Sequence, residues 1–460
     1  MRQCGTGVAC LDVMAELQTQ SPRLVRVMGF WMLTAYGVGD ILGAGIYALV
    51  GKVAGVAGSL SWLSFLVAGT VAGLSGLSYA ELGSRFPYSG GEAYFVQQAL
   101  GRPKLSFLTG WLVFCSGVVS MATIARAFAG YATHLVPEIP ESLAVVMLVS
   151  LLAAITFVGI RISSTANAVC TIIEATGLLL VVGSALVWLC GDSGVDELAT
   201  RETLTSVAGA NVVGPGFVSV LQGAALAFFA FIGFEDMVNV AEEVRDPKRT
   251  LPRALLTALV ASSMIYVLVV LVATTVIPAS LLAESDAPLL TVMETSWPQF
   301  PLVVFSIIAL FAVANTGLAN FVTASRLVFG MSEQNLLPRW LGWINPKTHT
   351  PDYAIAACFV VGLLLALSGS LSQLAGATSF LILVIFSLMN VSLILIRRRD
   401  GDSNGFRAPS ATPYVALACC MALLRFVSRE AATTALVIIA VGALFACGQK
   451  RTSESAGAES

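Results

Sequence analysis

Long apolar stretches separated by short polar segments dominate the sequence. A membrane-spanning helix needs about 20 consecutive apolar residues. Within hydrocarbon the backbone must satisfy its own hydrogen bonds, so each stretch of this kind is predicted to be a helix. The twelve predicted spans are residues 28–53, 59–82, 105–133, 141–160, 165–190, 216–240, 254–277, 301–328, 353–370, 374–396, 411–427 and 430–447.

The composition agrees with this pattern. Hydrophobic residues make up 57% of the 460 residues and charged residues only 11%, whereas about a quarter of a soluble protein is charged. The predicted fold class is therefore an all-α membrane protein with 12 transmembrane helices whose outer surface contacts the lipid bilayer. The net charge of −2 argues against a nucleic-acid partner, and nothing in the sequence indicates an obligatory protein partner.

The basic residues predict an orientation. In the twelve-span arrangement most lysines and arginines fall on one side, and the other side carries only Lys52, Arg201, Arg425 and Arg429. Loops rich in lysine and arginine stay in the cytoplasm. We therefore expect a multi-pass protein of a bacterial inner or plasma membrane, with both termini cytoplasmic and the loops 191–215 and 278–300 external.

The order of the spans indicates an internal repeat. A glycine-rich interruption in span one has a counterpart in span six, about 190 residues later, and the following spans keep that offset. Because five helices per unit is an odd number, the second copy enters the membrane from the opposite side, which gives a 5+5 inverted repeat. The predicted units are a tail at 1–27, the first repeat at 28–190, the second at 216–396, two further spans at 411–447, and a tail at 448–460.

The two interruptions predict a binding site for a zwitterion. A break in a membrane helix is tolerated where the freed backbone groups line a cavity; freed N–H groups suit a carboxylate, and freed carbonyls suit an ammonium group or a cation. We expect a substrate carboxylate and amine to bind these two segments, with an aromatic ring covering the substrate. The residues concerned are Gly43, Ala44, Gly45 and Ile46 in span one and Phe231, Ile232, Gly233 and Phe234 in span six. The alternative is that the glycines form a packing seam, since Gly39 and Gly43 have GxxxG spacing.

Several motifs resemble those of one transporter superfamily. Gly-Ala-Gly-Ile-Tyr at 43–47, Ser-Tyr-Ala-Glu-Leu at 78–82, Phe-Ile-Gly-Phe-Glu at 231–235 and Phe-Arg-Ala-Pro at 406–409 resemble the amino acid–polyamine–organocation superfamily, in particular its cationic amino acid transporter-like members. The resemblance covers roughly residues 25–447. It implies a leucine-transporter-like fold and amino acid transport by alternating access.

Three of the acidic residues within predicted spans are candidates for function. Ionisable groups inside a membrane are expensive and usually functional, so Asp40, Glu174 and Glu235 are candidates for coupling transport to protons or sodium. The resemblance places a lysine of several proton-coupled relatives near the position of Glu174, so it leaves the coupling ion open. The alternatives are a structural carboxyl paired with another helix for Glu174, and a cap on exposed N–H groups for Glu235. Asp40 could share a proton with Glu174, bind a cation or receive a substrate amine.

The sequence does not support an enzyme. It contains two histidines and has no HExxH, CxxC or P-loop motif, so no metal site or cofactor is predicted beyond a coupling ion. A GxSxG match at 401–405 lies in a polar loop, without the strand that a nucleophile elbow requires. The predicted function is secondary active transport of amino acids. The alternatives are an exchanger or carrier of polyamines or other organic cations and, more distantly, a channel.

Overall fold

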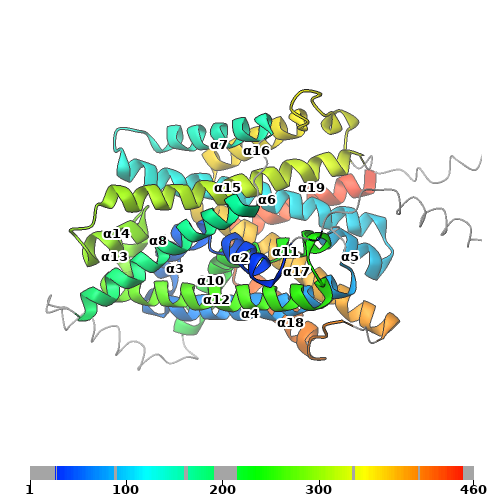
Figure 1. The fold of residues 1–460 in the computed structure, drawn as a ribbon, viewed down its shortest axis with the longest axis horizontal. Helices are drawn as coiled ribbons and strands as arrows, with labels where there is room; N and C mark the ends of the chain where they lie inside the picture. Colours follow the sequence, from blue (N-terminus) through cyan, green and yellow to red (C-terminus); the bar gives the residue numbers. More distant parts are fainter. Residues whose placement is uncertain are drawn as a thin grey trace, which may run out of the picture.

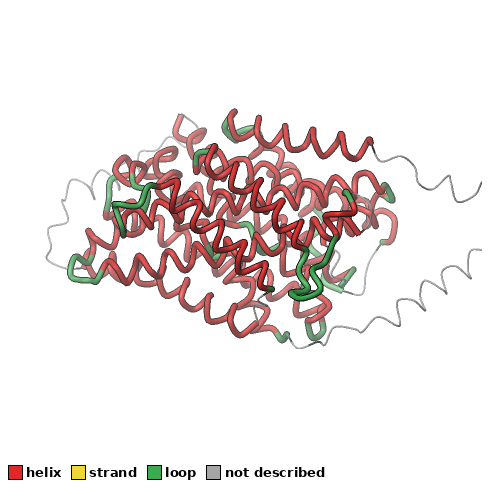
Figure 2. The backbone as a smooth tube through the Cα atoms, turned by 90° about the horizontal axis from the view of Figure 1, so that it is seen from above, coloured by secondary structure: helices red, strands yellow, loops and turns green. Residues whose placement is uncertain are grey.

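The protein is a bundle of long helices in the computed structural model, which describes residues 26, 28–87, 91–159, 164–190, 215–333, 337–401 and 405–448. These parts of the chain contain helices and connecting loops and no strand (Figures 1 and 2). The tail at 1–27 apart from Arg26, the loop 191–214 and residues 449–460 lie outside the described residues.

The helices follow the predicted apolar stretches closely. The first half of the chain forms α2 (Phe30–Ile41), α3 (Ala44–Ala57), α4 (Ser61–Arg85), α5 (Gly91–Leu100), α6 (Pro103–Leu135), α7 (Glu141–Val158) and α8 (Ser164–Cys190). The second half forms α10 (Pro215–Ala227), α11 (Asp236–Asn239), α12 (Pro247–Val276), α13 (Ala279–Glu284), α14 (Pro288–Ser296), α15 (Leu302–Glu333), α16 (Asp352–Ser368), α17 (Leu371–Asp400), α18 (Thr412–Leu424) and α19 (Arg429–Gly448). Short 3-10 turns occupy Gly58–Leu60, Phe228–Phe231, Ala241–Glu243 and Arg339–Gly342.

The prediction of an all-helical membrane protein is confirmed. Nine stretches of the described chain are long and apolar enough to cross a membrane, and α16 and α18 are shorter apolar helices. Side chains such as Ile172, Met264 and Leu364 are more than 60% exposed on outer helices, as expected where lipid replaces water.

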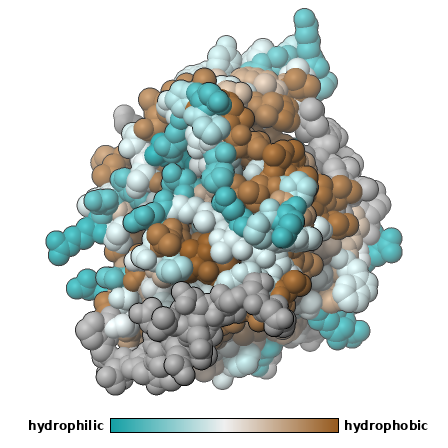
Figure 3. All heavy atoms as spheres, turned by 90° about the vertical axis from the view of Figure 1, so that its left-hand side faces the viewer, coloured by the Kyte–Doolittle hydropathy of each residue, from teal (hydrophilic) through white to brown (hydrophobic). Residues whose placement is uncertain are grey.

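Three short helices were not expected. α5 follows the second predicted span, and α13 and α14 lie in the segment predicted as the loop 278–300. They have 6 to 10 residues, so a search for apolar runs of membrane-spanning length does not detect them. Prolines mark the start of two of these helices: Pro278 precedes α13 and Pro288 opens α14. Figure 3 looks onto the end of the bundle that carries α13 and α14, where a band of hydrophilic residues crosses a more hydrophobic surface.

Both predicted interruptions are present. α2 ends at Ile41 and α3 begins at Ala44, while α10 gives way to a 3-10 turn at Phe228–Phe231 before α11. The broken segments pack against each other and against unbroken helices: α10 contacts α3 and α4, and α12 contacts α2 and α4. The predicted site therefore lies between helices that are far apart in the sequence.

A backbone bridge joins the two broken segments at one end. The Met28 N–H donates to the Glu243 carbonyl at 3.0 Å, and the Arg245 N–H donates to the Met28 carbonyl at 2.9 Å. The residues just before α2 are thus tied to the residues just after the second broken segment.

Candidate functional site

The first break is shaped by close contacts at its glycines. A Cβ atom on Gly43 would lie 2.0 Å from Oγ1 of Thr316 on α15, and one on Gly45 would lie 2.4 Å from the Cα of Ala230. Larger residues cannot fit at these positions without moving the backbone or Thr316. The glycines therefore serve close packing at the interruption, as the packing-seam alternative predicts, and substrate binding by this segment stays a prediction.

The N–H groups of the first break already have one partner. The Ala44 N–H donates to Oγ1 of Thr316 at 3.0 Å, so the hydroxyl of Thr316 stands where the sequence predicts a substrate carboxylate. The Thr316 hydroxyl donates its own proton to the Ala312 carbonyl at 3.1 Å, so it would have to leave that carbonyl before it could donate to a carboxylate. Thr316 thus belongs to the candidate site, although it gave no signal in the apolar sequence of its span.

The second break meets the first. Gly233 has a φ of +126°, and a Cβ there would lie 2.7 Å from the carbonyl oxygen of Asp40. Such a φ is accessible to glycine and strained for other residues. Phe231 and Phe234 on either side of this turn are fully buried, and Ile232 is half-buried in an extended conformation. The two segments predicted to bind a zwitterion are therefore in direct backbone contact.

Tyr266 of α12 connects the two breaks. Its hydroxyl is within hydrogen-bond distance of the carbonyl oxygen of Ile41, at the end of α2, and lies 3.0 Å from that of Ala230, in the 3-10 turn of the second broken segment. A hydroxyl has one proton, so it can donate to only one of these carbonyls at a time. Tyr266 is fully buried, and it was missed in the sequence because a tyrosine within an apolar run looks like core packing.

Glu235 caps its own loop. Its Oε2 accepts a hydrogen bond of 2.9 Å from the Gly233 N–H, which is the capping role considered as an alternative for this residue. Glu235 also lines a small cavity of about 40 Å³ together with Glu92, Asp236 and Asn320. This volume is large enough to hold a water molecule. The carboxyl of Glu92 accepts a hydrogen bond of 3.3 Å from the hydroxyl of Tyr79.

Glu174 is a fully buried carboxyl of α8. Its Oε1 accepts a hydrogen bond of 3.0 Å from the amide of Asn315 on α15, while its Oε2 is buried without a partner among the described residues. The Glu174 carbonyl accepts a hydrogen bond of 2.9 Å from the hydroxyl of Tyr47. A single neutral donor does not satisfy an ionised carboxylate.

Asp40 lies at the same junction. Oδ2 of Asp40 is also buried and has no hydrogen-bond partner within the described part of the chain. A Cβ on Gly39 would lie 1.9 Å from Oγ1 of Thr171, which is about one turn from Glu174 on α8. α2 and α8 therefore bring Asp40 and Glu174 to one contact region, without a hydrogen bond between them in the described structure. No group of three or more metal-ligating side chains occurs among the described residues.

Comparisons with known proteins agree with this architecture. Residues 28–448, almost the whole chain, match the family described as amino acid permease. The chain is 29% identical over 403 residues to cationic amino acid transporter 3, mitochondrial, of Arabidopsis thaliana; the alignment covers 83% of this chain and 64% of the relative. It is 27% identical over 427 residues to the branched-chain amino acid permease BcaP of Bacillus subtilis, covering 87% and 88% of the two chains. An uncharacterized transporter of Mycobacterium tuberculosis is 30% identical over 419 residues, covering 91% and 90%.

Proposed function

Because the chain belongs to the amino acid permease family of the amino acid–polyamine–organocation superfamily, we propose that it is a secondary active transporter of amino acids that works by alternating access. Its family is one of permeases and not of enzymes, in agreement with the expectation from the sequence. The observation that carries the proposal is the contact between two broken helices, whose backbone groups at the breaks bond to the side chains of Thr316 and Tyr266. Such a site is suited to the carboxylate and amine shared by all amino acids.

The proposed topology has twelve spans arranged as a 5+5 inverted repeat with two further helices. Support comes from the position of the breaks, one between α2 and α3 and the other after α10, each opening a set of five predicted spans. With both termini in the cytoplasm, α13 and α14 lie on the external side and α5 on the cytoplasmic side. The cell membrane remains the proposed location.

The substrate carboxylate is proposed to bind at Gly43, Ala44, Gly45 and Ile46. In the structure the Thr316 hydroxyl accepts the hydrogen bond from the Ala44 N–H. When a carboxylate binds, the Ala44 N–H would therefore leave Thr316 or be shared between Thr316 and the carboxylate. The amine is proposed to bind carbonyls at Phe231, Ile232 and Gly233, with Phe234 packed beside them. One relative is named for cationic amino acids and another for branched-chain amino acids. The proposal therefore covers recognition of the α-amino and α-carboxylate groups and names no substrate side chain.

Asp40 and Glu174 are the proposed coupling groups, with Glu235 as the third candidate. The support for the first two is that each has a buried oxygen without a donor in the described structure, which a proton or a sodium ion would satisfy. Glu235 differs, because its Oε2 already accepts a backbone hydrogen bond.

Uptake by purified protein in liposomes tests the proposal. A panel of labelled amino acids with imposed pH or sodium gradients should reveal saturable uptake that one gradient drives above equilibrium. Flux that does not saturate with substrate would instead indicate a channel, and the absence of any amino acid flux would overturn the proposal.

A carrier of organic cations is the second candidate. Its support is the cavity lined by Glu92, Glu235 and Asp236 beside the second break. Competition between an amino acid and its decarboxylated analogue distinguishes an amino acid transporter from a carrier of organic cations. Loss of charge-assisted hydrogen bonds costs about 1.5–3 kcal/mol, so an amino acid site should bind the analogue about tenfold to a hundredfold more weakly, whereas equal competition would favour the organic-cation carrier.

A further inference from the structure

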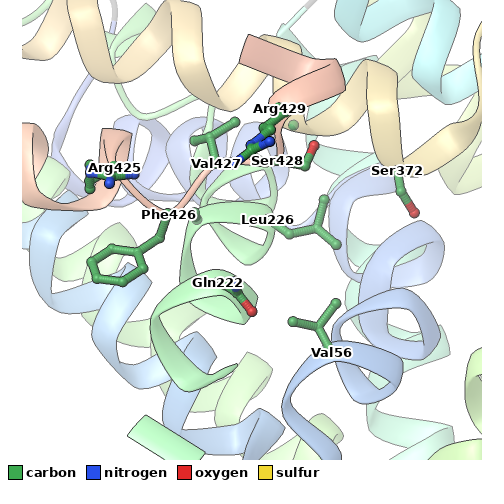
Figure 4. Close-up of a pocket in the computed structure, with 11 residues that line it drawn as sticks. Val56, Gln222, Leu226, Ser372, Arg425, Phe426, Val427, Ser428 and Arg429 are labelled. Carbon is green, nitrogen blue, oxygen red and sulfur yellow. The ribbon is translucent and has the colours of Figure 1, made fainter. Parts of the chain in front are cut away.

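A crevice separate from the two breaks lies where α18 turns back into α19 (Figure 4). It has a volume of about 440 Å³ and is lined by the end of α3, one face of α10, the start of α17 and the turn 425–428. All of its lining residues lie within the described chain. In the proposed topology this is the external end of the bundle.

Two arginines, Arg425 and Arg429, border the crevice. In the described structure Lys52, at the same end, pairs with Asp286 at 3.7 Å, and Arg126 pairs with Glu141 at 3.3 Å. Arg425 and Arg429 form no ion pair with any described residue. Among the described residues the positive charge of these two arginines is therefore not paired with an acidic side chain.

The turn that carries the arginines is well held. The Arg425 N–H donates to the Ala422 carbonyl at 3.1 Å, and the Phe426 N–H donates to the Leu423 carbonyl at 2.9 Å. On the other side the Ala432 N–H donates to the Ser428 carbonyl at 2.9 Å. These hydrogen bonds hold the backbone on either side of the turn, so the Cα positions of Arg425 and Arg429 are fixed.

The walls of the crevice are largely apolar. Val56 and Leu226 form one side and Phe426 and Val427 the other, with the amide of Gln222 between them (Figure 4). The floor is tight because a Cβ on Gly376 of α17 would lie 2.8 Å from the Cβ of Ala431 on α19. A small hydrated anion gains nothing from such walls, whereas a lipid presents a charged phosphate together with apolar chains.

The position of the crevice agrees with this chemistry. The turn between two membrane helices lies at the boundary between hydrocarbon and water, where lipid headgroups are found. Basic pockets between membrane helices bind anionic headgroups on the cytoplasmic side, and the same attraction between charges acts at the external end. Arginine also matches phosphate geometry through its forked donors. We propose that this crevice binds one anionic phospholipid, with its phosphate held by Arg425 and Arg429 and the start of its acyl chains against Leu226 and Val427.

Binding of phosphatidylglycerol to the delipidated full-length protein in detergent, followed by native mass spectrometry, tests the proposal. The test variant combines Arg425→Gln with Arg429→Gln. The matched control combines Arg102→Gln with Lys104→Gln, which removes two exposed basic side chains at the start of α6. A third variant, Arg425→Lys with Arg429→Lys, keeps the charge and removes only the fork.

The wild type and the control should bind phosphatidylglycerol alike, and the glutamine variant should bind it at least about tenfold more weakly. The lysine variant should fall between them, which a misfolded protein would not do. Equal binding by the wild type and the glutamine variant would overturn the proposal. Displacement of the lipid by millimolar inorganic phosphate would also overturn it, because the site would then take a free anion.

Discussion

Gly45 and Ala230 touch backbone to backbone, since a Cβ on Gly45 would lie 2.4 Å from the Cα of Ala230. The two broken segments therefore cross at this point with no room for a side chain. We expect Gly45→Ala to force them apart and abolish amino acid uptake in liposomes, with a lowered unfolding temperature.

Gly73→Ala is the matched control for that substitution. Gly73 lies within α4, and a Cβ there would meet no atom within 4 Å. Alanine is better than glycine within a helix by about 0.5–1 kcal/mol, so this variant should be as stable as the wild type or slightly more stable, with normal uptake. Normal uptake by Gly45→Ala would show that the close crossing is not required.

Tyr266→Phe should impair transport while the protein still folds. The substitution keeps the ring and removes the hydroxyl that lies between the carbonyls of Ile41 and Ala230. A buried acceptor without its donor costs about 1–3 kcal/mol, and here the loss falls on the two segments proposed to bind substrate. Substrate affinity and uptake rate in liposomes are the measurements.

Tyr414→Phe serves as the control for Tyr266. Tyr414 lies on α18 and is 50% exposed, so removal of its hydroxyl should leave uptake unchanged. If Tyr266→Phe bound substrate and transported it like the wild type, the bridge between the breaks would be dispensable.

The positions of the breaks could be predicted because they have a local cause. Clustered glycines lower the cost of non-helical backbone wherever they occur, and Gly43 and Gly233 mark both interruptions in the sequence. The apolar runs likewise predicted the long helices, because the thickness of the bilayer sets the length of a membrane-spanning helix.

The partners of the site could not be predicted, because they depend on which helix faces come together. Asn315 and Thr316 are neighbours in one apolar span and Tyr266 lies in another, and the sequence does not show which helix each of these polar side chains faces. The three-dimensional arrangement also shows that Glu235 caps Gly233, a role the sequence left open beside coupling.

Glu81→Gln should destabilise the protein strongly. The Glu81 carboxylate is fully buried; it accepts hydrogen bonds from Nη2 of Arg85 at 2.7 Å, from Nε of Arg397 at 3.0 Å and from the Ala408 N–H at 2.8 Å. It thereby joins the ends of α4 and α17 to the segment before α18. Removal of its charge leaves two guanidinium groups without their counter-ion, at a cost of about 3–5 kcal/mol.

Thermal unfolding in detergent measures this effect, with Asp400→Asn as the control. Asp400 pairs with Arg399 at 2.6 Å, but both side chains are exposed, and an exposed ion pair contributes little to stability. An unfolding temperature for Glu81→Gln that matched the control would contradict a structural role for this cluster.

Glu174→Gln should uncouple transport from its driving gradient. Glutamine keeps the volume of the side chain and an oxygen that can accept the hydrogen bond from Asn315, while it removes the group that can gain and lose a proton. If Glu174 carries the coupled proton, the variant should lose accumulation driven by a pH gradient yet keep substrate binding and exchange.

If Glu174 instead helps to bind sodium, accumulation driven by a sodium gradient should fail, with little dependence on pH. A structural carboxyl predicts either poor expression or unchanged coupling. Concentrative uptake at the wild-type level by Glu174→Gln would remove this residue from the mechanism and leave Asp40, whose Oδ2 is also without a partner in the described structure, as the stronger of the two remaining candidates.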